Sequence, residues 1–307
     1  MGTIKNVAVV GAAGKIGRPI VARLLATQLF TITVLTRDGS KQLAFPEEVI
    51  VKEVDYDSVS SLETALQGQD AVVSAMAFEA IDKQKSLVDA AAKAGVKRII
   101  PSEYGNDTLN PKLATVPIYQ PKIAIRELCE QKAAENPNNF SWTTIQNASF
   151  LAPDWTLDFV VDVKERKADI KDGGDVLFCA TTYEDIAQTV AGILTHLEET
   201  ANRPVRISSV NTTQNEIIAL AKELGATEGW NLTYSNTGDL EAEARKRWAA
   251  GDHSDEVIAM FINRAFIGEG WGGYFPVLDN ELLGIKGIGK SGLRDIVRLA
   301  MDRNSLD

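Results

Sequence analysis

Val7-Ala-Val-Val-Gly-Ala-Ala-Gly-Lys-Ile-Gly17 is the stretch of sequence that decides the fold. A short apolar run from Ile4 to Val10 leads into it and is typical of a buried strand. After the last glycine, Ile20, Leu24 and Leu25 recur at helical spacing. The sequence therefore predicts a strand, a tight turn and a helix in immediate succession.

The three glycines of this stretch suit a turn that binds a dinucleotide. Gly11 permits a sharp turn, Gly14 leaves room for backbone N–H groups near a pyrophosphate, and Gly17 lets the helix pack close to the strand. The helix N-terminus adds partial positive charge for the phosphates. The spacing is GxxGxxG rather than GxGxxG, so the flanking strand and helix are the stronger support. A glycine-rich turn without a ligand is the alternative.

The composition is typical of a globular protein. The chain has 307 residues, 45% of them hydrophobic, which suffices for one large domain or two. Its formal net charge of −10 disfavours nucleic acid as a partner. Cys129 and Cys179 lack neighbours at metal-ligand spacing, so we interpret them as buried thiols and expect no metal site. We recognise no signal peptide and no apolar run of membrane-spanning length, and therefore expect a cytosolic protein.

Strand-like and helix-like segments alternate along the first half of the chain. The expected strands are 4–10, 31–36, 49–54, 70–74, 97–101 and 141–146, and the expected later helices are 58–66, 79–94 and 119–134. This alternation predicts a parallel sheet with right-handed crossovers and helices on both faces. Ligands bind at the carboxyl ends of such strands, so we expect the glycine turn, Arg37, Ser74–Ala77, Pro101–Glu103 and Asn147–Phe150 to face one crevice.

The alternation ends near Phe150. We therefore expect a Rossmann-type dinucleotide-binding domain at residues 1–150 and a smaller α+β substrate-binding part at residues 151–307, interleaved with the first and without a flexible linker. The expected elements of the second part are strands at 176–179 and 204–210, a helix at about 182–196 and a helix after the capping box at 213–216. The sequence thus predicts an α/β fold with a doubly wound parallel sheet, and leaves open whether the protein is a monomer or a homodimer.

The end of the second expected strand indicates the choice of cofactor. Arg37 lies about 20 residues after the last glycine, where an acidic residue selects NAD and an arginine accommodates the 2′-phosphate of NADP. Arg37 and Lys41 provide two cations there against the carboxylate of Asp38. This balance predicts NADPH. A solvated loop charge is the alternative interpretation of Arg37.

Lys122 is the candidate for proton transfer. No tyrosine is followed four residues later by a lysine, which disfavours the Tyr-x-x-x-Lys mechanism of many short-chain dehydrogenases. Lys122 lies near the expected start of a helix, where the helix N-terminus and a cationic nicotinamide would lower its pKa. A surface lysine is the alternative. His196 and His253 are more typical of a helix end and a polar surface than of catalysis. Ser102–Tyr104 either position a ligand or cap a turn.

These segments together resemble the NmrA-like, isoflavone-reductase-like atypical short-chain dehydrogenases, particularly the fungal members. The matching segments are Val9–Gly17, Lys97–Asp107, the helix with Lys122, Asn147–Phe150, Thr182–Ile186 and Thr212–Glu216. They span nearly the whole chain. The run Pro101-Ser-Glu-Tyr-Gly-Asn106 is more specific than the glycine motif.

The resemblance implies NADPH on the glycine turn, with Arg37 and Lys41 on the 2′-phosphate. It also implies that Lys122 contacts the nicotinamide ribose and assists proton transfer, and that Phe150 lies near the nicotinamide ring. The expected cofactor contacts are Gly11, Ala13, Gly14, Lys15, Ile16, Gly17, Arg37, Lys41, Ser74, Ala75, Met76, Lys122, Asn147 and Phe150.

Three activities are compatible with this resemblance. Plant relatives reduce phenylpropanoid-type aromatic substrates, which implies an NADPH-dependent reductase of a small aromatic or conjugated carbonyl compound. The second half of the chain departs from those relatives, so the substrate itself does not carry over. A non-catalytic regulator that senses NADP(H) is the alternative, although such members tend to lack the lysine. An epimerase or dehydratase is a weaker third reading, since the Tyr-x-x-x-Lys pair is missing.

Overall fold

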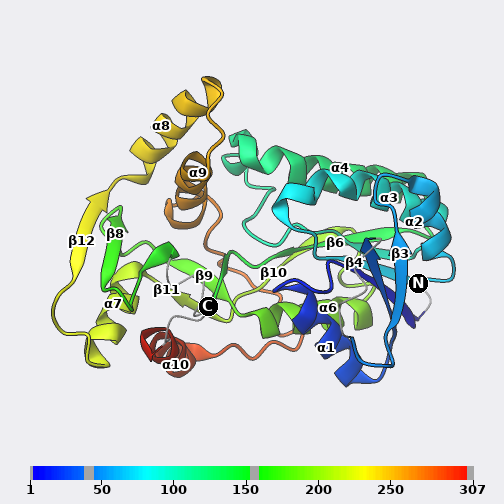
Figure 1. Ribbon diagram of the computed structural model, residues 1–307, viewed down its shortest axis with the longest axis horizontal. Coiled ribbons are helices and arrows are strands. Elements are labelled where there is room, and N and C mark those ends of the chain that lie inside the picture. The colour runs from blue at the N-terminus through cyan, green and yellow to red at the C-terminus, as the bar shows by residue number, and fades with distance from the viewer. Residues whose placement is uncertain (1–2, 38–44, 153–158, 303–307) are drawn as a thin grey trace.

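A parallel sheet with helices on both faces forms the larger part of the protein (Figure 1). The computed structural model describes residues 3–37, 45–152 and 159–302. Seven strands lie in the order β10-β6-β5-β4-β1-β2-β3, and every neighbouring pair is parallel. Their bounds are β1 Asn6–Val10, β2 Thr31–Arg37, β3 Ile50–Val54, β4 Ala71–Ser74, β5 Arg98–Ile100, β6 Ser141–Gln146 and β10 Arg203–Arg206. This sheet confirms the predicted doubly wound α/β fold.

The alternation of side chains along β1 explains why both faces are covered. The flanking helices are α1 Gly17–Thr27, α2 Val59–Leu66, α3 Gln84–Lys93, α4 Gln120–Glu135 and α6 Tyr183–Thr195. Val7 and Val9 pack into one hydrophobic cluster with α1 and α6. Ala8 and Val10 point the other way and pack into a second cluster with α2, α3 and α4. A strand buried on both faces forms a nearly continuous apolar run, here Val7 to Val10, which is why β1 is recognisable in the sequence.

The smaller part is built from two short sheets, β11-β9-β7 and β12-β8, and from helices α7 to α10. Their bounds are β7 Ser149–Phe150, β8 Lys167–Lys171, β9 Phe178–Thr181, β11 Val210–Thr212, β12 Asn231–Ser235, α7 Gln214–Glu223, α8 Thr237–Ala249, α9 Asp255–Ile267 and α10 Gly289–Asp302. Most of these elements surround a hydrophobic cluster of their own, to which α10 contributes Leu293, Val297 and Ala300. This part therefore has its own core beside the main sheet.

The two halves of the sequence interleave in space. β10 comes from the second half but pairs with β6 in the main sheet, with Val205 opposite Ile145. Helix α6 also comes from the second half and packs against α1. The division of the chain at residue 150 stays a prediction.

Two segments differ from the expected secondary structure. The helix expected at 79–94 is a 3₁₀ segment at Phe78–Lys83 followed by α3. The side-chain oxygen of Gln84 accepts a hydrogen bond from the backbone N–H of Ser102 (2.6 Å), which fixes the start of α3 against the end of β5. The strand expected at 204–210 is two strands, because β10 pairs with β6 whereas β11 pairs with β9 in a different sheet.

A buried arginine ties the middle of the sheet to the end of α6. Arg98 donates hydrogen bonds of 2.8 Å to the hydroxyls of Ser141, Thr143 and Thr200, and one of 2.5 Å to the carbonyl oxygen of Leu197. Burial lowers the pKa of Arg98 to about 10. The guanidinium therefore links β5, β6 and the connection that leads to β10.

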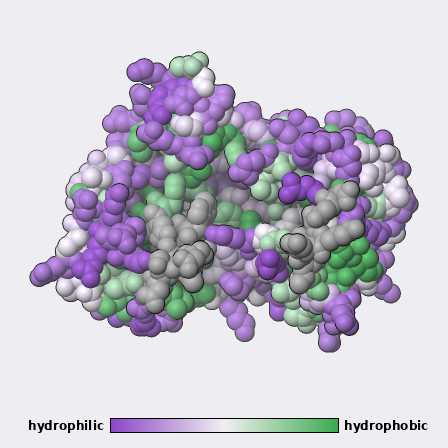
Figure 2. Space-filling model, in the orientation of Figure 1, coloured by the Kyte–Doolittle hydropathy of each residue, from purple (hydrophilic) through white to green (hydrophobic). Residues whose placement is uncertain are grey.

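The surface is mainly hydrophilic in the view of Figure 2, with hydrophobic residues gathered in a few patches. Among the described residues, none of the helices combines the length and apolar character needed to cross a membrane.

Candidate functional site

The glycine turn between β1 and α1 is built from backbone atoms in close contact. Gly11 has a φ of +72°, and a Cβ built on it would lie 2.2 Å from the carbonyl oxygen of Ala75. A Cβ on Gly17 would lie 2.1 Å from the carbonyl oxygen of Gly11. Real Cβ atoms do not approach backbone oxygens this closely, so both positions require glycine. The end of β1, the end of β4 and the start of α1 therefore meet at one point.

The N-terminus of α1 is suited to an anion. Its N-cap, Ile16, makes no side-chain capping hydrogen bond, and the first turn contains no acidic residue. The first N–H groups of a helix lack partners within the helix and attract negative charge. Gly14 and Lys15 are exposed beside this end, and Ala13 is half-buried. The geometry expected of a phosphate-binding turn is present, whereas phosphate binding itself stays a prediction.

Of the two cations expected near the ribose, only Arg37 lies within the described residues. It is the last residue of β2 and is exposed. Lys41 and Asp38 lie outside the described residues. The structure therefore supplies one exposed cation at the carboxyl edge of β2.

The segments after β4, β5 and β6 lie side by side at the same edge. The Ser102 hydroxyl donates to the carbonyl oxygen of Met76 (2.8 Å), which joins the segments after β4 and β5. The backbone N–H of Ala148 donates to the carbonyl oxygen of Gly105 (2.9 Å), which joins the segments after β5 and β6. Ala75 directly follows β4, and its backbone N–H donates to the carbonyl oxygen of Val10 (2.8 Å). The fold thus brings together segments that are separate in the sequence, as the crevice prediction requires.

Buried polar atoms without a partner are concentrated along this edge. Within the described ranges, such atoms include Ser74 Oγ, Glu103 Oε2, Tyr104 OH, both amide atoms of Asn106, Gln146 Oε1 and Asn147 Oδ1. A buried polar atom without a hydrogen bond costs roughly 1–3 kcal/mol, so such a group needs an explanation. A ligand rich in amide and hydroxyl groups would satisfy several of them.

Lys122, near the start of α4, points its amino group at the loop after β5. Nζ donates to the carbonyl oxygens of Glu103 and Tyr104, the latter at 3.2 Å. A Cβ on Gly105 would lie 3.6 Å from Nζ, so this loop passes close to the amine. Burial lowers the pKa of Lys122 to about 8, while the nearby Glu103 carboxylate acts to raise it. Lys122 is therefore a half-buried residue whose amine is held at the strand edge, rather than a surface lysine.

Phe150 and the two histidines lie in different surroundings. The ring of Phe150 is half-buried and packs 5.8 Å from the ring of Tyr183 at the start of α6. His196 is the C-cap of α6, and its Nδ1 lies 3.0 Å from the carbonyl oxygen of Gly192. His253 lies against the ring of Trp248, with 4.1 Å between the centroids. Both histidines thus have local structural contacts.

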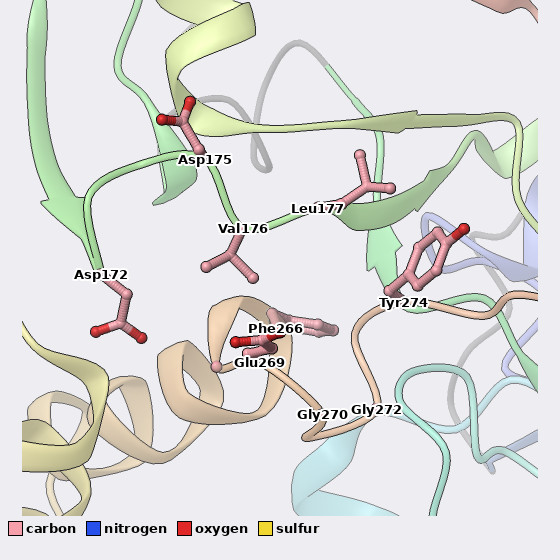
Figure 3. Close-up of a pocket in the computed structure, with 10 residues that line it drawn as sticks. Asp172, Asp175, Val176, Leu177, Phe266, Glu269, Gly270, Gly272 and Tyr274 are labelled. Carbon is pink, nitrogen blue, oxygen red and sulfur yellow. The ribbon is translucent and has the colours of Figure 1, made fainter.

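A pocket of about 400 Å³ lies between the β8–β9 connection and the loop after α9 (Figure 3). In Figure 3, Val176 points toward Phe266. Leu177 and Tyr274 lie at the end of the pocket away from Asp172. The lining residues are Asp172, Asp175, Val176, Leu177, Phe266, Gly268, Glu269, Gly270, Gly272 and Tyr274. The pocket therefore combines apolar and aromatic side chains with carboxylates.

This pocket adjoins the loop that also contacts Lys122. A Cβ on Gly272 would lie 3.4 Å from the backbone nitrogen of Asp107. Asp107 is two residues after Gly105, a span of at most about 7 Å. The Asp107 carboxylate accepts hydrogen bonds from Gln146 (2.9 Å) and Arg206 (2.8 Å), which fixes the loop to the main sheet. Gly272 of the pocket lining thus lies next to the loop after β5, whose carbonyls hold Lys122.

The model of the NmrA-like family matches residues 3–235 of the sequence. The chain belongs to the NmrA-like family. The resemblance inferred from the glycine turn and from the run at residues 101–106 is thereby confirmed.

Relatives of this NmrA-like chain include redox enzymes. The chain is 36% identical to oxidoreductase aprR of Aspergillus flavus over 251 residues. The aligned region covers 80% of each protein. A solved structure of leucoanthocyanidin reductase from Vitis vinifera with NADPH has a TM-score of 0.77 at 19% identity, covering 97% of this chain and 100% of that one. The structure of AtPrR2 with NADP⁺ and (+)-pinoresinol has a TM-score of 0.77 at 23% identity, covering 98% and 100%. These structures share the fold of this NmrA-like chain.

Sequence reasoning missed some residues of this edge. Asn106 and Gln146 were not among the expected site residues, although both are buried with unpartnered polar atoms. Asn106 ends the most specific motif of the NmrA-like resemblance, which was a usable signal. Gln146 ends β6, and nothing in its sequence surroundings distinguishes it. In the described parts of the chain, no group of three or more His, Cys, Asp or Glu side chains is arranged to hold a metal ion.

Proposed function

We propose that this NmrA-like protein is an NADPH-dependent oxidoreductase that reduces a small aromatic or conjugated carbonyl compound, with Lys122 assisting proton transfer. The observation that carries the proposal is the placement of Lys122 Nζ at the carboxyl edge of the sheet, held by two backbone carbonyls. The relative aprR is an oxidoreductase, and neighbours of the same fold bind NADPH or NADP⁺. These findings support a redox role for the chain.

The residues of the edge fit a dinucleotide. Gly11 and Gly17 leave no room for a Cβ, and the uncapped N-terminus of α1 offers N–H donors to a diphosphate. Arg37 would face the 2′-phosphate at the end of β2. Ser74 and Asn147 present unpartnered buried atoms where the nicotinamide half would lie. When bound, the reduced nicotinamide would supply two electrons and one hydrogen to the substrate.

The surroundings of Lys122 suit the transfer of one proton. An ammonium has three N–H donors, and two of them are bonded to the carbonyl oxygens of Glu103 and Tyr104. The third N–H is the one that can be given to a substrate oxygen. The N–H bond breaks, an O–H bond forms, and the lone pair stays on nitrogen. The neutral amine keeps both of its hydrogen bonds and regains a proton from water.

The pocket beside Asp107 is a candidate for the body of the substrate. Phe266, Tyr274 and Val176 offer an apolar surface for an aromatic ring. The carboxylates of Asp172, Asp175 and Glu269 in its lining would disfavour an anionic substrate. We therefore expect neutral or cationic aromatic compounds to be preferred.

The proposal is tested by NADPH oxidation with a panel of aromatic enones and aldehydes. Lys122→Ala should lower kcat by about 100-fold, in the range typical of general acid–base catalysis. Lys132→Ala is the matched control, because Lys132 lies on the same helix and makes surface ion pairs with Asp89 and Glu135. Turnover by the wild type should fall as the pH rises through about 8, because Lys122 then loses the proton it donates.

Two results would contradict the proposal. Equal rates for the wild type and Lys122→Ala would remove Lys122 from the mechanism. Equal binding of NADP⁺ and NADPH, with no substrate able to oxidise NADPH, would favour a non-catalytic sensor of the cofactor instead.

A further inference from the structure

We infer that Glu103 is a positioning residue that keeps Lys122 protonated, because its buried carboxyl belongs to the same residue whose backbone carbonyl holds Nζ. The catalytic consequence rests on the proposed function of Lys122, whereas the coupling between the two side chains can be measured without turnover. Glu103 lies directly after β5 and belongs to the loop whose carbonyls hold Nζ.

Glu103 bonds to Lys122 through its backbone, whereas its side-chain carboxyl has other surroundings. Its backbone carbonyl accepts a hydrogen bond from Nζ. Its side chain is buried, with Oε1 bonded to the hydroxyl of Thr108 and Oε2 without a partner among the described residues. The described contacts contain no ion pair between this carboxylate and Nζ within 4.0 Å. The carboxyl therefore acts on the amine through its charge, while the backbone sets the direction of the N–H bonds.

Burial and the charges around Glu103 bring the pKa of its carboxyl close to neutral pH. The titratable groups that couple to it electrostatically are Lys122, Arg126 and Cys129 on α4 and Asp107 on its own loop. Burial raises the pKa of Glu103 to about 7, against the opposing effects of Thr108 and the two cations. Arg126 is itself bonded to Glu130 (2.5 Å), which offsets part of its charge. Of the two cations on α4 that act on Glu103, Lys122 is thus the one without a carboxylate partner among the described residues.

Burial moves the pKa values of the two groups toward each other, raising that of the Glu103 carboxyl and lowering that of the Lys122 amine. When the carboxyl is ionised and the amine is protonated, each favours the charged form of the other. Removing the carboxylate should therefore lower the pKa of Lys122, because burial alone then acts on the amine.

The coupling is tested by NMR titration of the protein with lysine labelled at Cε. The Lys122 signal is assigned from its loss in Lys122→Arg. Glu103→Gln keeps the shape and the acceptor for Thr108 and removes the charge, so the pKa of Lys122 should fall by about one unit. Thr108→Val should give a smaller fall, because the Thr108 hydroxyl stabilises the ionised carboxylate.

Thr144→Val is the control, since Thr144 is a buried hydroxyl of β6 without a partner among the described residues. It should leave the pKa of Lys122 unchanged. A wild-type pKa in Glu103→Gln overturns the inference, and if that variant does not fold, a wild-type pKa in Thr108→Val does so.

A second measurement separates this inference from the proposed function. Where a substrate is turned over, the fall of kcat with rising pH should begin at a lower pH in Glu103→Gln than in the wild type. The displacement should equal the fall in the pKa of Lys122, and an unchanged pH profile would contradict the role of Glu103. A shifted pKa of Lys122 in a protein that never oxidises NADPH supports the coupling and refutes the reductase.

Discussion

At the scale of single residues, the glycine turn is a contact between backbone atoms. The carbonyl oxygen of Gly11 occupies the place where a side chain on residue 17 would begin. Gly14 differs, because a Cβ there would meet only the same oxygen at 3.3 Å, and the residue is exposed. Gly17 is therefore required by the protein's own packing, whereas Gly14 is required only if something binds on the outside of the turn.

Alanine at these two positions should consequently have different effects. Gly17→Ala should destabilise the protein by about 1–3 kcal/mol, as overpacking does, and weaken dinucleotide binding. Gly14→Ala should weaken NADPH binding at least tenfold, about 1.4 kcal/mol, with little loss of stability. Calorimetry and chemical denaturation measure the two effects. Unchanged NADPH affinity in Gly14→Ala would argue against a diphosphate at the turn.

Arg37 supports a prediction about cofactor choice. The wild type should bind NADPH at least tenfold more tightly than NADH, about 1.4 kcal/mol, because the exposed guanidinium can pair with the 2′-phosphate. Arg37→Glu should remove most of that preference in a direct binding measurement. The ratio of the two affinities is the decisive quantity, and its persistence in Arg37→Glu would place the phosphate elsewhere.

The sequence gives the position of Lys122 but not its surroundings. Its place near a helix start after the fifth strand is readable from the spacing of the elements. Its two acceptors, the carbonyls of Glu103 and Tyr104, lie 19 and 18 residues earlier in the chain. Such contacts depend on how α4 packs against the loop after β5, which no local pattern encodes.

At the scale of elements, side-chain caps mark the start of three helices that the sequence predicts. Ser58, Thr182 and Thr213 each accept the backbone N–H three residues on, at the N-termini of α2, α6 and α7. The predicted capping box at α7 is only half formed, because the carboxylate of Glu216 accepts from the Thr212 hydroxyl (3.1 Å). Elements with a clear cap and an apolar face were therefore predictable, and the reciprocal half of the box was not.

Arg98 shows what the sequence pattern of a strand conceals. It stands in a short apolar strand, yet its guanidinium organises β5, β6 and the segment after α6. Arg98→Met should lower the free energy of unfolding by about 3 kcal/mol, because several buried acceptors lose a charged donor. Arg294→Met is the control, since the surface pair of Arg294 with Glu223 should contribute about 0–1 kcal/mol. Equal losses in urea denaturation would contradict the structural role of Arg98.

At the scale of the whole molecule, the second half of the chain contributes β10 to the seven-stranded sheet that the first half begins. β10 forms the edge of the sheet beside β6, and α6 packs on the same face of the sheet as α1. The first six strands were predictable because each alternates with a helix. The seventh, β10, was expected as a strand but not as a strand of this sheet, because the segment 204–210 is divided between two sheets. The pocket was also beyond the sequence, since its walls come from segments about 90 residues apart.

We propose that one edge of this sheet holds both the dinucleotide and the amine of Lys122. A crystal structure of the protein with NADP⁺ tests it most directly, because no substrate has to be known. We predict that the diphosphate lies against Gly14 at the N-terminus of α1 and that the nicotinamide ribose lies within hydrogen-bond distance of Lys122 Nζ. A dinucleotide bound away from the glycine turn, or one whose nicotinamide half lies far from Lys122, would contradict it.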